Sequence, residues 1–199
     1  MTAERDVTRD FYAQSASSYA DDTVGQTETV YLRHFAGCLS PGDFVLELGC
    51  GSGRDSAFLL SRGLRMKPTD GIAEMAEAAQ SRLGVPVDVL PFDQIAFEAE
   101  FEGVWANACL LHVPRLELPA ILNRIHRALK PSGLFYASYK AGQGEGLDGF
   151  GRYFNYPDRD WLADAYAEHW QTVEIESSTG SGYDMQPTEW LHVFARKEA

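Results

Sequence analysis

Short apolar runs alternate along the chain with segments whose apolar residues recur at helical spacing. Near-continuous apolar runs predict strands buried on both faces, whereas recurrence every three or four residues predicts amphipathic helices. Strands are expected at residues 44–48, 64–69, 85–90, 101–106, 134–139, 172–177 and 189–196, and helices at 54–61, 72–82, 116–129 and 157–170. This alternation favours an α/β fold with a largely parallel sheet.

Turn-forming residues refine the pattern. Pro86 lies within the third expected strand and cannot donate a ladder hydrogen bond, so this strand is expected at an edge of the sheet. Residues 130–133 predict a turn before the fifth strand, and residues 178–188 predict a hairpin connection that pairs the last two strands antiparallel. The Gly-rich stretch 141–151 predicts a long loop, a feature that is usually functional or mobile.

Two further helices are expected in the N-terminal forty residues. One carries Phe11, Tyr12, Ala16 and Tyr19 at amphipathic spacing, and the other covers residues 29–38.

Length, composition and charge limit the kinds of molecule that the protein is expected to bind. The 199 residues suit one domain over 1–199, and the net charge of −12 comes without any basic block. Binding to nucleic acid or to an anionic membrane needs clustered Lys and Arg, so neither partner is expected. No apolar stretch resembles a signal peptide or a membrane span, which predicts a cytoplasmic protein. We also expect a small-molecule substrate, and a monomer or homodimer.

The three cysteines, Cys38, Cys50 and Cys109, are far apart and lack paired metal-ligand spacing. Free thiols are expected, with neither a disulfide nor a metal site.

A glycine loop follows the first strand and precedes a helix. Gly49, Gly51 and Gly53 form the pattern G-x-G-x-G, in which glycine lets the backbone turn sharply and approach a ligand closely. The dinucleotide pattern G-x-G-x-x-G requires a third glycine where this chain has Arg54, and no Gly-Lys-Ser/Thr follows to make a phosphate-binding P-loop. Glu47, just before the loop, repels phosphate but can attract a cationic ammonium.

Asp70 is expected at the end of the second strand. A carboxylate at this place can accept hydrogen bonds from both hydroxyls of a ribose. It also suits a plain cap for the helix that follows, and the two roles are compatible.

The chain is similar to a known family at several of these places. Residues 47–53, Glu-Leu-Gly-Cys-Gly-Ser-Gly, resemble motif I of the class I S-adenosylmethionine-dependent methyltransferases. The acidic motif of that family is resembled by Asp70 with Met75. Its fourth strand and the segment after it are resembled by residues 101–107 with Leu110, Leu111 and His112. The turn before its fifth strand is resembled by residues 127–133. Residues 11–23 and 151–154 resemble a bacterial branch related to the tellurite-resistance methyltransferases.

The resemblance implies a Rossmann-like sheet of seven strands in the order 3-2-1-4-5-7-6, with strand seven antiparallel and helices on both faces. It implies S-adenosylmethionine as cofactor and S-adenosylhomocysteine as product, with residues 1–40 as a helical lid. The implied cofactor contacts are Gly49, Cys50, Gly51 and Gly53 in the loop, Asp70 at the ribose, Gly71, Ile72, Phe92 and Asp93 around the adenine, and Asn107 and Ala108 near the sulfonium.

Other candidate contacts have competing structural roles. Tyr12 and Tyr19 share a helix face and suit a sulfonium cation, or simply pack. Arg54 and Asp55 follow the loop, where Asp55 also favours the helix dipole. The family often has Ser at position 72, a glycine at 132 and an acid near the adenine, where this chain has Ile72, Ser132 and Pro91.

Few residues are candidates for the acceptor side. His112 follows the fourth strand and suits a general base or a hydrogen-bond partner of the substrate, or equally a histidine bonded to backbone. Lys140 follows the fifth strand and either attracts an anionic substrate or is a solvated loop charge. Arg152 and Tyr153, with Phe154, either close over the site after the Gly-rich loop or belong to a disordered loop.

Three functions remain open from the sequence. The first is transfer of a methyl group from S-adenosylmethionine to a small-molecule acceptor. The second is a nicotinamide-dependent oxidoreductase, which Arg54 at the third glycine position disfavours. The third is a non-catalytic S-adenosylmethionine-binding protein.

Overall fold

The computed structural model describes residues 7–16, 29–168, 170–183 and 185–199, and contains a mixed sheet in the order β3-β2-β1-β4-β5-β9-β8. β9 runs antiparallel to both of its neighbours, and β1 to β5 are parallel. The strands are β1 (Phe44–Leu48), β2 (Arg65–Asp70), β3 (Asp88–Val89), β4 (Phe101–Ala106), β5 (Leu129–Lys140), β8 (Trp170–Ser181) and β9 (Pro187–Lys197).

A small separate hairpin pairs β6 (Gly146–Leu147) with β7 (Tyr153–Phe154). When this hairpin is left out of the numbering, the main sheet has the order 3-2-1-4-5-7-6 with strand seven antiparallel. The fold class and the strand order that the resemblance implied are therefore confirmed.

The helices begin and end where local chemistry favours it. Thr29 caps α2 by accepting from Leu32 N at 3.1 Å, and Gly84 ends α4 in the left-handed region at φ +67°. The helices are α2 (Val30–Gly37), α3 (Arg54–Ser61), α4 (Ala73–Leu83), α5 (Leu118–Ala128) and α6 (Arg159–Ala165), with a helix over residues 7–16 and the 3₁₀ turns η1 (Phe92–Gln94) and η2 (Leu110–His112).

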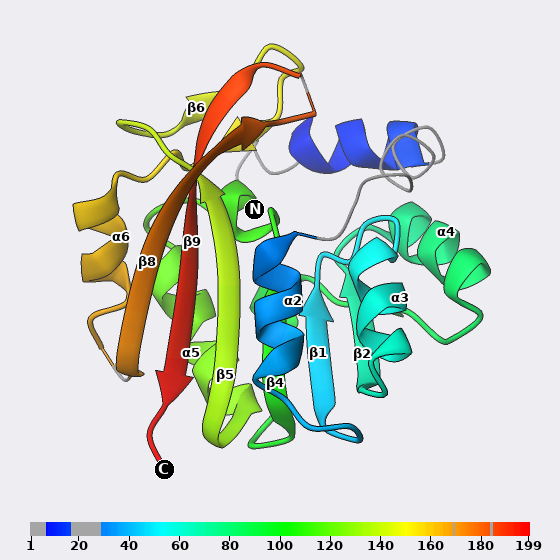
Figure 1. Cartoon of the computed structure of the whole chain (residues 1–199). Helices are drawn as coiled ribbons and strands as arrows, with labels where there is room; N and C mark the ends of the chain where they lie inside the picture. The colour runs from blue at the N-terminus through cyan, green and yellow to red at the C-terminus, as the bar shows by residue number, and fades with distance from the viewer. Residues whose placement is uncertain (1–6, 17–28, 169, 184) are drawn as a thin grey trace.

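Helices cover both faces of the sheet (Figure 1). α2 and α3 pack on the face that carries Val45 and Trp105, whereas α5 and α6 pack on the face that carries Leu46 and Val104. Neighbouring strand residues thus enter opposite cores, which explains why these strands are apolar without alternation. Trp105 is fully buried and stacks on Tyr136, with ring centres 3.9 Å apart.

Two expected strand boundaries were wrong. The third strand shrinks from residues 85–90 to Asp88–Val89, because Pro86 removes a donor just before it; its place at the sheet edge is confirmed. The turn expected at 130–133 is a bulge inside β5, where Ser132 adopts φ +62°. Across this bulge Phe101 pairs with Leu129 but Gly103 pairs with Leu134.

The C-terminal half departs from expectation at two places. The expected helix 157–170 is the shorter α6, which begins where Asp158 accepts from Trp161 N at 2.8 Å, and β8 already starts at Trp170. The Gly-rich stretch 141–151 is not one long loop, since it contains β6 and returns through Asp148 to β7.

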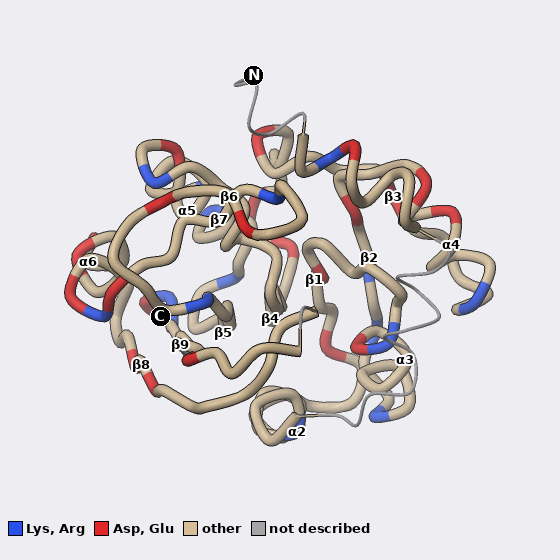
Figure 2. The backbone as a smooth tube through the Cα atoms, turned by 90° about the horizontal axis from the view of Figure 1, so that it is seen from above, with Lys and Arg blue, Asp and Glu red and all other residues tan. Residues whose placement is uncertain are grey.

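Charge is spread over the surface rather than gathered on one side. Figure 2 shows acidic positions on most peripheral elements, with basic positions interspersed among them. Within the described ranges no helix is both long and apolar enough to cross a membrane. Cys38 is exposed, Cys50 and Cys109 are buried, and all three are free thiols.

The packing of α2 on the sheet generates a stability prediction. Phe35 is fully buried, and its ring centre lies 5.0 Å from that of Trp105. Phe35→Ala is expected to lower the free energy of unfolding by about 3–5 kcal/mol, because it leaves a cavity beneath the helix. Urea denaturation measures the change, with Leu116→Ala as control at a side chain that is 95% exposed. Equal losses in both variants would contradict the packing role.

Candidate cofactor and acceptor site

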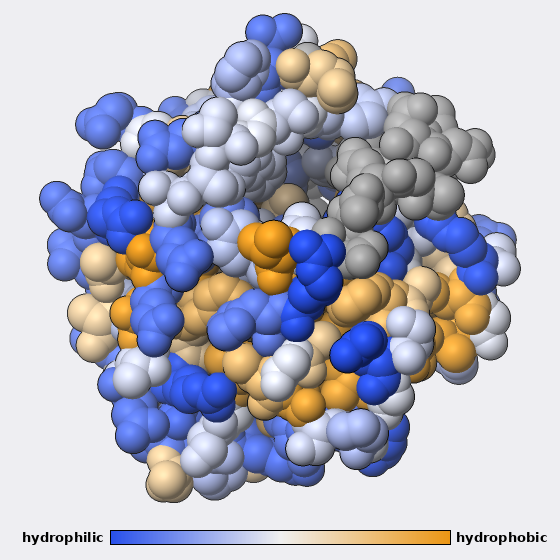
Figure 3. Space-filling model, viewed as in Figure 1, coloured by the Kyte–Doolittle hydropathy of each residue, from blue (hydrophilic) through white to orange (hydrophobic). Residues whose placement is uncertain are grey.

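The loop after β1 turns at three glycines with positive φ: Gly49 at +62°, Gly51 at +55° and Gly53 at +74°. A Cβ on Gly49 would lie 2.5 Å from that of Cys109, so even alanine does not fit there. The loop thus exposes backbone at the carboxyl end of the sheet, where ligands bind in open α/β folds. Figure 3 shows the surface hollowed just above α2, on the side toward which β1 points in Figure 1.

Asp70 ties this loop to the end of β2. Its Oδ2 accepts from Gly51 N and its Oδ1 from Ile72 N, each at 3.0 Å. Burial raises the pKa of Asp70 to about 6, although these backbone hydrogen bonds act to lower it. Each carboxylate oxygen retains further accepting capacity, as a ribose diol requires.

Glu47 lies below the loop and is 3% exposed. Ser56, at the start of α3, donates a hydrogen bond to its Oε2. Burial, together with the charge of Asp55, raises the pKa of Glu47 well above its ordinary value. A cation bound nearby would favour the ionised form of this carboxyl.

The residues expected around an adenine come together beside Asp70. A Cβ on Gly71 would lie 3.7 Å from Pro91 Cα, and Leu90 N donates to Asp70 O at 2.8 Å, so the chain after β2 lies against the chain after β3. Ile72 precedes α4, while Phe92 and Asp93 lie in η1 directly after Pro91.

Arg54 and Asp55 are held by protein groups. Arg54 Nε donates to Asp55 Oδ1 at 2.7 Å, and Asp55 Oδ2 accepts from Trp105 Nε1 at 2.9 Å and from Asn107 Nδ2 at 3.0 Å. These bonds support the structural role that the sequence left open beside a cofactor role. They also fix the amide of Asn107 at the end of β4.

Ser138, which sequence reasoning missed, extends this network to β5. Its hydroxyl donates to Asn107 Oδ1 at 2.8 Å and accepts from Ala108 N at 2.8 Å. Ala108 adopts φ +52°, a conformation that these bonds help to hold. The only signal in the sequence was a hydroxyl near the end of an apolar strand.

His112 is bonded at both ring nitrogens. Its Nδ1 lies 2.6 Å from Tyr153 O and its Nε2 lies 3.0 Å from Tyr12 Oη. Burial lowers the pKa of His112 to about 4; the bond to Tyr153 acts against this, and the charge of Arg152 adds to it. The side chain is therefore a neutral imidazole at neutral pH. Its bond to Tyr153 O matches the expected alternative of a histidine bonded to backbone, while Nε2 is bonded to a side chain.

Lys140 and Arg152 occupy different surroundings. Lys140, at the end of β5, is 6% exposed and its Nζ lies 4.7 Å from the ring centre of Phe154, so it is not a solvated loop charge. Arg152 is 2% exposed and forms an ion pair with Asp148, a residue that the sequence did not single out. Tyr153 donates its hydroxyl to Glu145, and Tyr19 lies outside the described residues.

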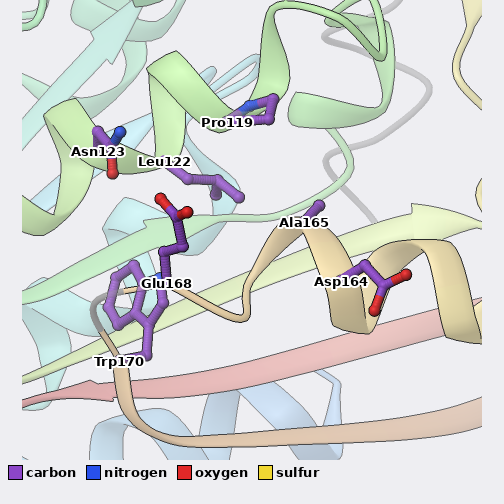
Figure 4. A pocket seen from close by; sticks show the side chains of 7 residues that line it. All are labelled: Pro119, Leu122, Asn123, Asp164, Ala165, Glu168 and Trp170. Atoms are coloured by element: carbon purple, nitrogen blue, oxygen red, sulfur yellow. The ribbon is translucent and has the colours of Figure 1, made fainter.

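A second groove lies away from this site, between α5, α6 and the start of β8 (Figure 4). It is lined by Pro119, Leu122, Asn123, Asp164, Ala165, Glu168 and Trp170. None of these residues lies at the carboxyl end of a parallel strand, so the groove is separate from the candidate site. Among the described residues no group of His, Cys, Asp and Glu is arranged to hold a metal ion.

Comparison with known proteins finds a family match over the region that holds the glycine loop and Asp70. Residues 45–133 match the family model described as a methyltransferase domain. The match covers a little under half of the chain, and in this region the chain is similar to methyltransferases. An uncharacterised methyltransferase of Synechocystis sp. is 32% identical over 101 residues, covering 49% of this chain and 47% of that protein. The malonyl-[acyl-carrier protein] O-methyltransferase of Serratia marcescens is 24% identical over 148 residues, covering 71% and 56%.

Solved methyltransferases share the fold over nearly the whole chain. The 1,6-didemethyltoxoflavin-N1-methyltransferase of Burkholderia thailandensis, solved with its substrate and S-adenosylhomocysteine, is 26% identical at a TM-score of 0.75 and matches 100% of this chain and 92% of its own. The magnesium protoporphyrin IX methyltransferase of Synechocystis is 16% identical at a TM-score of 0.69, covering 99% of each. The chain spans about half the length of the curated relatives that it matches. The narrower resemblance to tellurite-resistance methyltransferases stays a prediction.

The glycine loop generates a second prediction. Gly49→Ala is expected to lower the free energy of unfolding by about 1–2 kcal/mol for the left-handed backbone and about 1–3 kcal/mol more for the clash with Cys109. Gly84→Ala is the matched control, because Gly84 has φ +67° with nothing within 4 Å of an added Cβ. Chemical denaturation of both variants measures the difference; similar losses would show that the close approach to Cys109 is unimportant.

Proposed function

We propose that the protein binds S-adenosylmethionine and transfers its methyl group to a small-molecule acceptor. The observation that carries this proposal is Asp70, fixed by Gly51 N and Ile72 N between the G-x-G-x-G loop and the adenine-side residues. In this arrangement Asp70 would bind the ribose, and Gly49, Cys50, Gly51 and Gly53 the methionine part. Gly71, Ile72, Phe92 and Asp93 would surround the adenine, with Asn107 and Ala108 near the sulfonium.

The chemistry requires little from the protein beyond alignment. The sulfonium already activates its methyl group, so the chain must hold nucleophile, methyl carbon and sulfur in line and exclude water. His112 is neutral at neutral pH, and because Tyr153 O accepts from Nδ1, Nε2 is its unprotonated nitrogen. As the bond from carbon to sulfur breaks and the bond to the acceptor atom forms, the acceptor's proton would pass to the Tyr12 oxygen while the Tyr12 proton passes to this nitrogen.

The acceptor side would lie between His112, Lys140 and the helix over residues 7–16. Lys140 would attract an anionic group, and Tyr12 and Tyr153 would line the entrance. The buried ion pair of Arg152 supports an indirect role for this residue rather than contact with the acceptor. The lid role of residues 1–40, the cytoplasmic location and the monomeric or homodimeric state stay predictions.

The oxidoreductase alternative needs a third glycine where the side chain of Arg54 instead bonds Asp55. Calorimetric titration with S-adenosylmethionine and with NAD separates the two functions, and heat from NAD alone would refute the proposal. Release of labelled methyl to members of a metabolite panel separates an enzyme from a non-catalytic binding protein.

Removal of the ribose carboxylate tests the site itself. Asp70→Ala is expected to weaken binding of S-adenosylmethionine by about 1–3 kcal/mol, because charged hydrogen bonds to the ribose are lost. Calorimetry measures the affinity, and circular dichroism verifies the fold. Asp88→Asn, at an exposed carboxylate on β3, is the control and should bind as the wild type does. Unchanged affinity in folded Asp70→Ala would refute the ribose assignment.

The raised pKa of Asp70 predicts pH-dependent binding. Because only the ionised carboxylate accepts from both hydroxyls, protonation near pH 6 competes with the cofactor. Affinity for S-adenosylmethionine should be constant above about pH 7 and fall by up to about tenfold per pH unit below pH 6. Asp70→Asn should bind weakly with a flatter profile, which separates this effect from titration of Glu47. An identical slope in the variant would assign the pH dependence elsewhere.

A further inference from the structure

Three segments that are far apart in sequence meet on the guanidinium group of Arg152. This side chain is 2% exposed, and five aromatic rings surround it. Its Cζ lies 5.0 Å from the ring centre of Phe11, 5.7 Å from Tyr12, 5.4 Å from Phe150, 5.3 Å from Phe154 and 5.6 Å from Tyr183. The rings come from the helix over residues 7–16, from the stretch that holds β6 and β7, and from the connection between β8 and β9. Arginine suits such a site because its flat, weakly hydrated cation stacks on ring faces.

Asp148 sets the direction in which Arg152 donates. Its Oδ2 accepts from Nε at 2.9 Å and from Nη2 at 2.7 Å, while its Oδ1 accepts from the backbone N of Phe150 and of Arg152. This two-point contact orients the plane of the guanidinium. Nη1 then points to the helix over residues 7–16 and donates to Tyr12 Oη at 3.1 Å.

The donors and acceptors assign the protons along this chain of bonds. Tyr153 O only accepts, so the proton of neutral His112 is on Nδ1. Nε2 is then an acceptor, and the hydroxyl of Tyr12 donates to it. The Tyr12 oxygen can accept from Arg152, which only donates.

We propose that Arg152 is a positioning residue, which holds the hydroxyl of Tyr12 so that this hydroxyl donates to the unprotonated Nε2 of His112. The inference rests on the proposed function, in which His112 faces the acceptor. Asp148 and the five rings hold Arg152, Arg152 holds Tyr12, and Tyr12 holds the imidazole.

The charges around His112 agree with this arrangement. Tyr12 faces it from the helix over residues 7–16, Arg152 and Asp148 from the stretch that holds β6 and β7, and Lys140 from β5. Burial is the main cause of its low pKa of about 4, Arg152 and Lys140 lower that pKa further, and Asp148 acts against them. Glu145 bonds the hydroxyl of Tyr153, whose carbonyl accepts from His112.

The test measures His112 directly by nitrogen NMR of the whole protein without cofactor, with His112→Gln used to assign the signal. In the wild type, Nε2 should show the shift of an unprotonated nitrogen down to about pH 4. Tyr12→Phe and Arg152→Gln should shift the Nε2 signal, because each loses or loosens the hydrogen bond that this nitrogen accepts, and Arg152→Gln should also raise the pKa of His112 by removing a charge that lowers it. Arg152→Lys, which retains the charge, should restore part of the wild-type behaviour.

Arg115→Gln is the matched control. Arg115 also fastens this part of the chain, donating to Asn155 O at 2.8 Å and to Tyr156 O at 2.7 Å and stacking on Trp161, but no bond joins it to Tyr12 or His112. It should lower thermal stability and leave the pKa and tautomer of His112 unchanged.

An unchanged His112 signal in folded Tyr12→Phe and Arg152→Gln would overturn the inference. If Arg152→Gln does not fold, Tyr12→Phe decides alone, because it removes a single oxygen atom. A parallel calorimetric titration of the wild type with S-adenosylmethionine distinguishes the two proposals. Loss of cofactor binding would refute the proposed function, whereas the NMR result without cofactor decides the role of Arg152.

Discussion

The site depends on one buried carboxylate that joins the ends of two neighbouring parallel strands. Asp70 ends β2, and its oxygens hold the backbone N–H groups of Gly51 and Ile72. Cys50 N donates in turn to Thr69 O at 2.9 Å, so loop and strand are tied on both sides. A carboxylate with a raised pKa is costly to bury ionised, and a bound ligand with two hydroxyls would repay that cost.

A second set of polar groups fixes the other side of the loop. Asp55 accepts from Trp105 and Asn107, and Asn107 is bonded in turn to Ser138. These contacts join α3, β4 and β5 beneath the place where a sulfonium would lie. Such a network is rigid when all its members are satisfied, and rigidity is what an in-line transfer needs from its surroundings.

The sequence predicted those features that are determined by residues close together along the chain. The alternation of apolar runs and helical patterns predicted the fold class, and Pro86 predicted the edge position of the third strand, whereas the strand order was implied by the family resemblance. The bulge at Ser132 could not, because it depends on the pairing of β4 with β5. Arg152 was noticed but its partner was not, since Tyr12 lies 140 positions away and only tertiary packing joins them.

What the sequence predicted and what it missed correspond to two parts of the candidate site, the cofactor side and the acceptor side. The methyltransferase domain match ends at residue 133, and it contains the loop, Asp70, the adenine-side residues and His112. The helix over residues 7–16, Lys140, Asp148 and Arg152 all lie outside the match. The matched part would hold the cofactor, whereas Lys140 and the helix over residues 7–16, outside the match, would line the acceptor side together with His112. The acceptors of the relatives therefore do not transfer to this chain, and the surroundings of His112 are the place to search for its own.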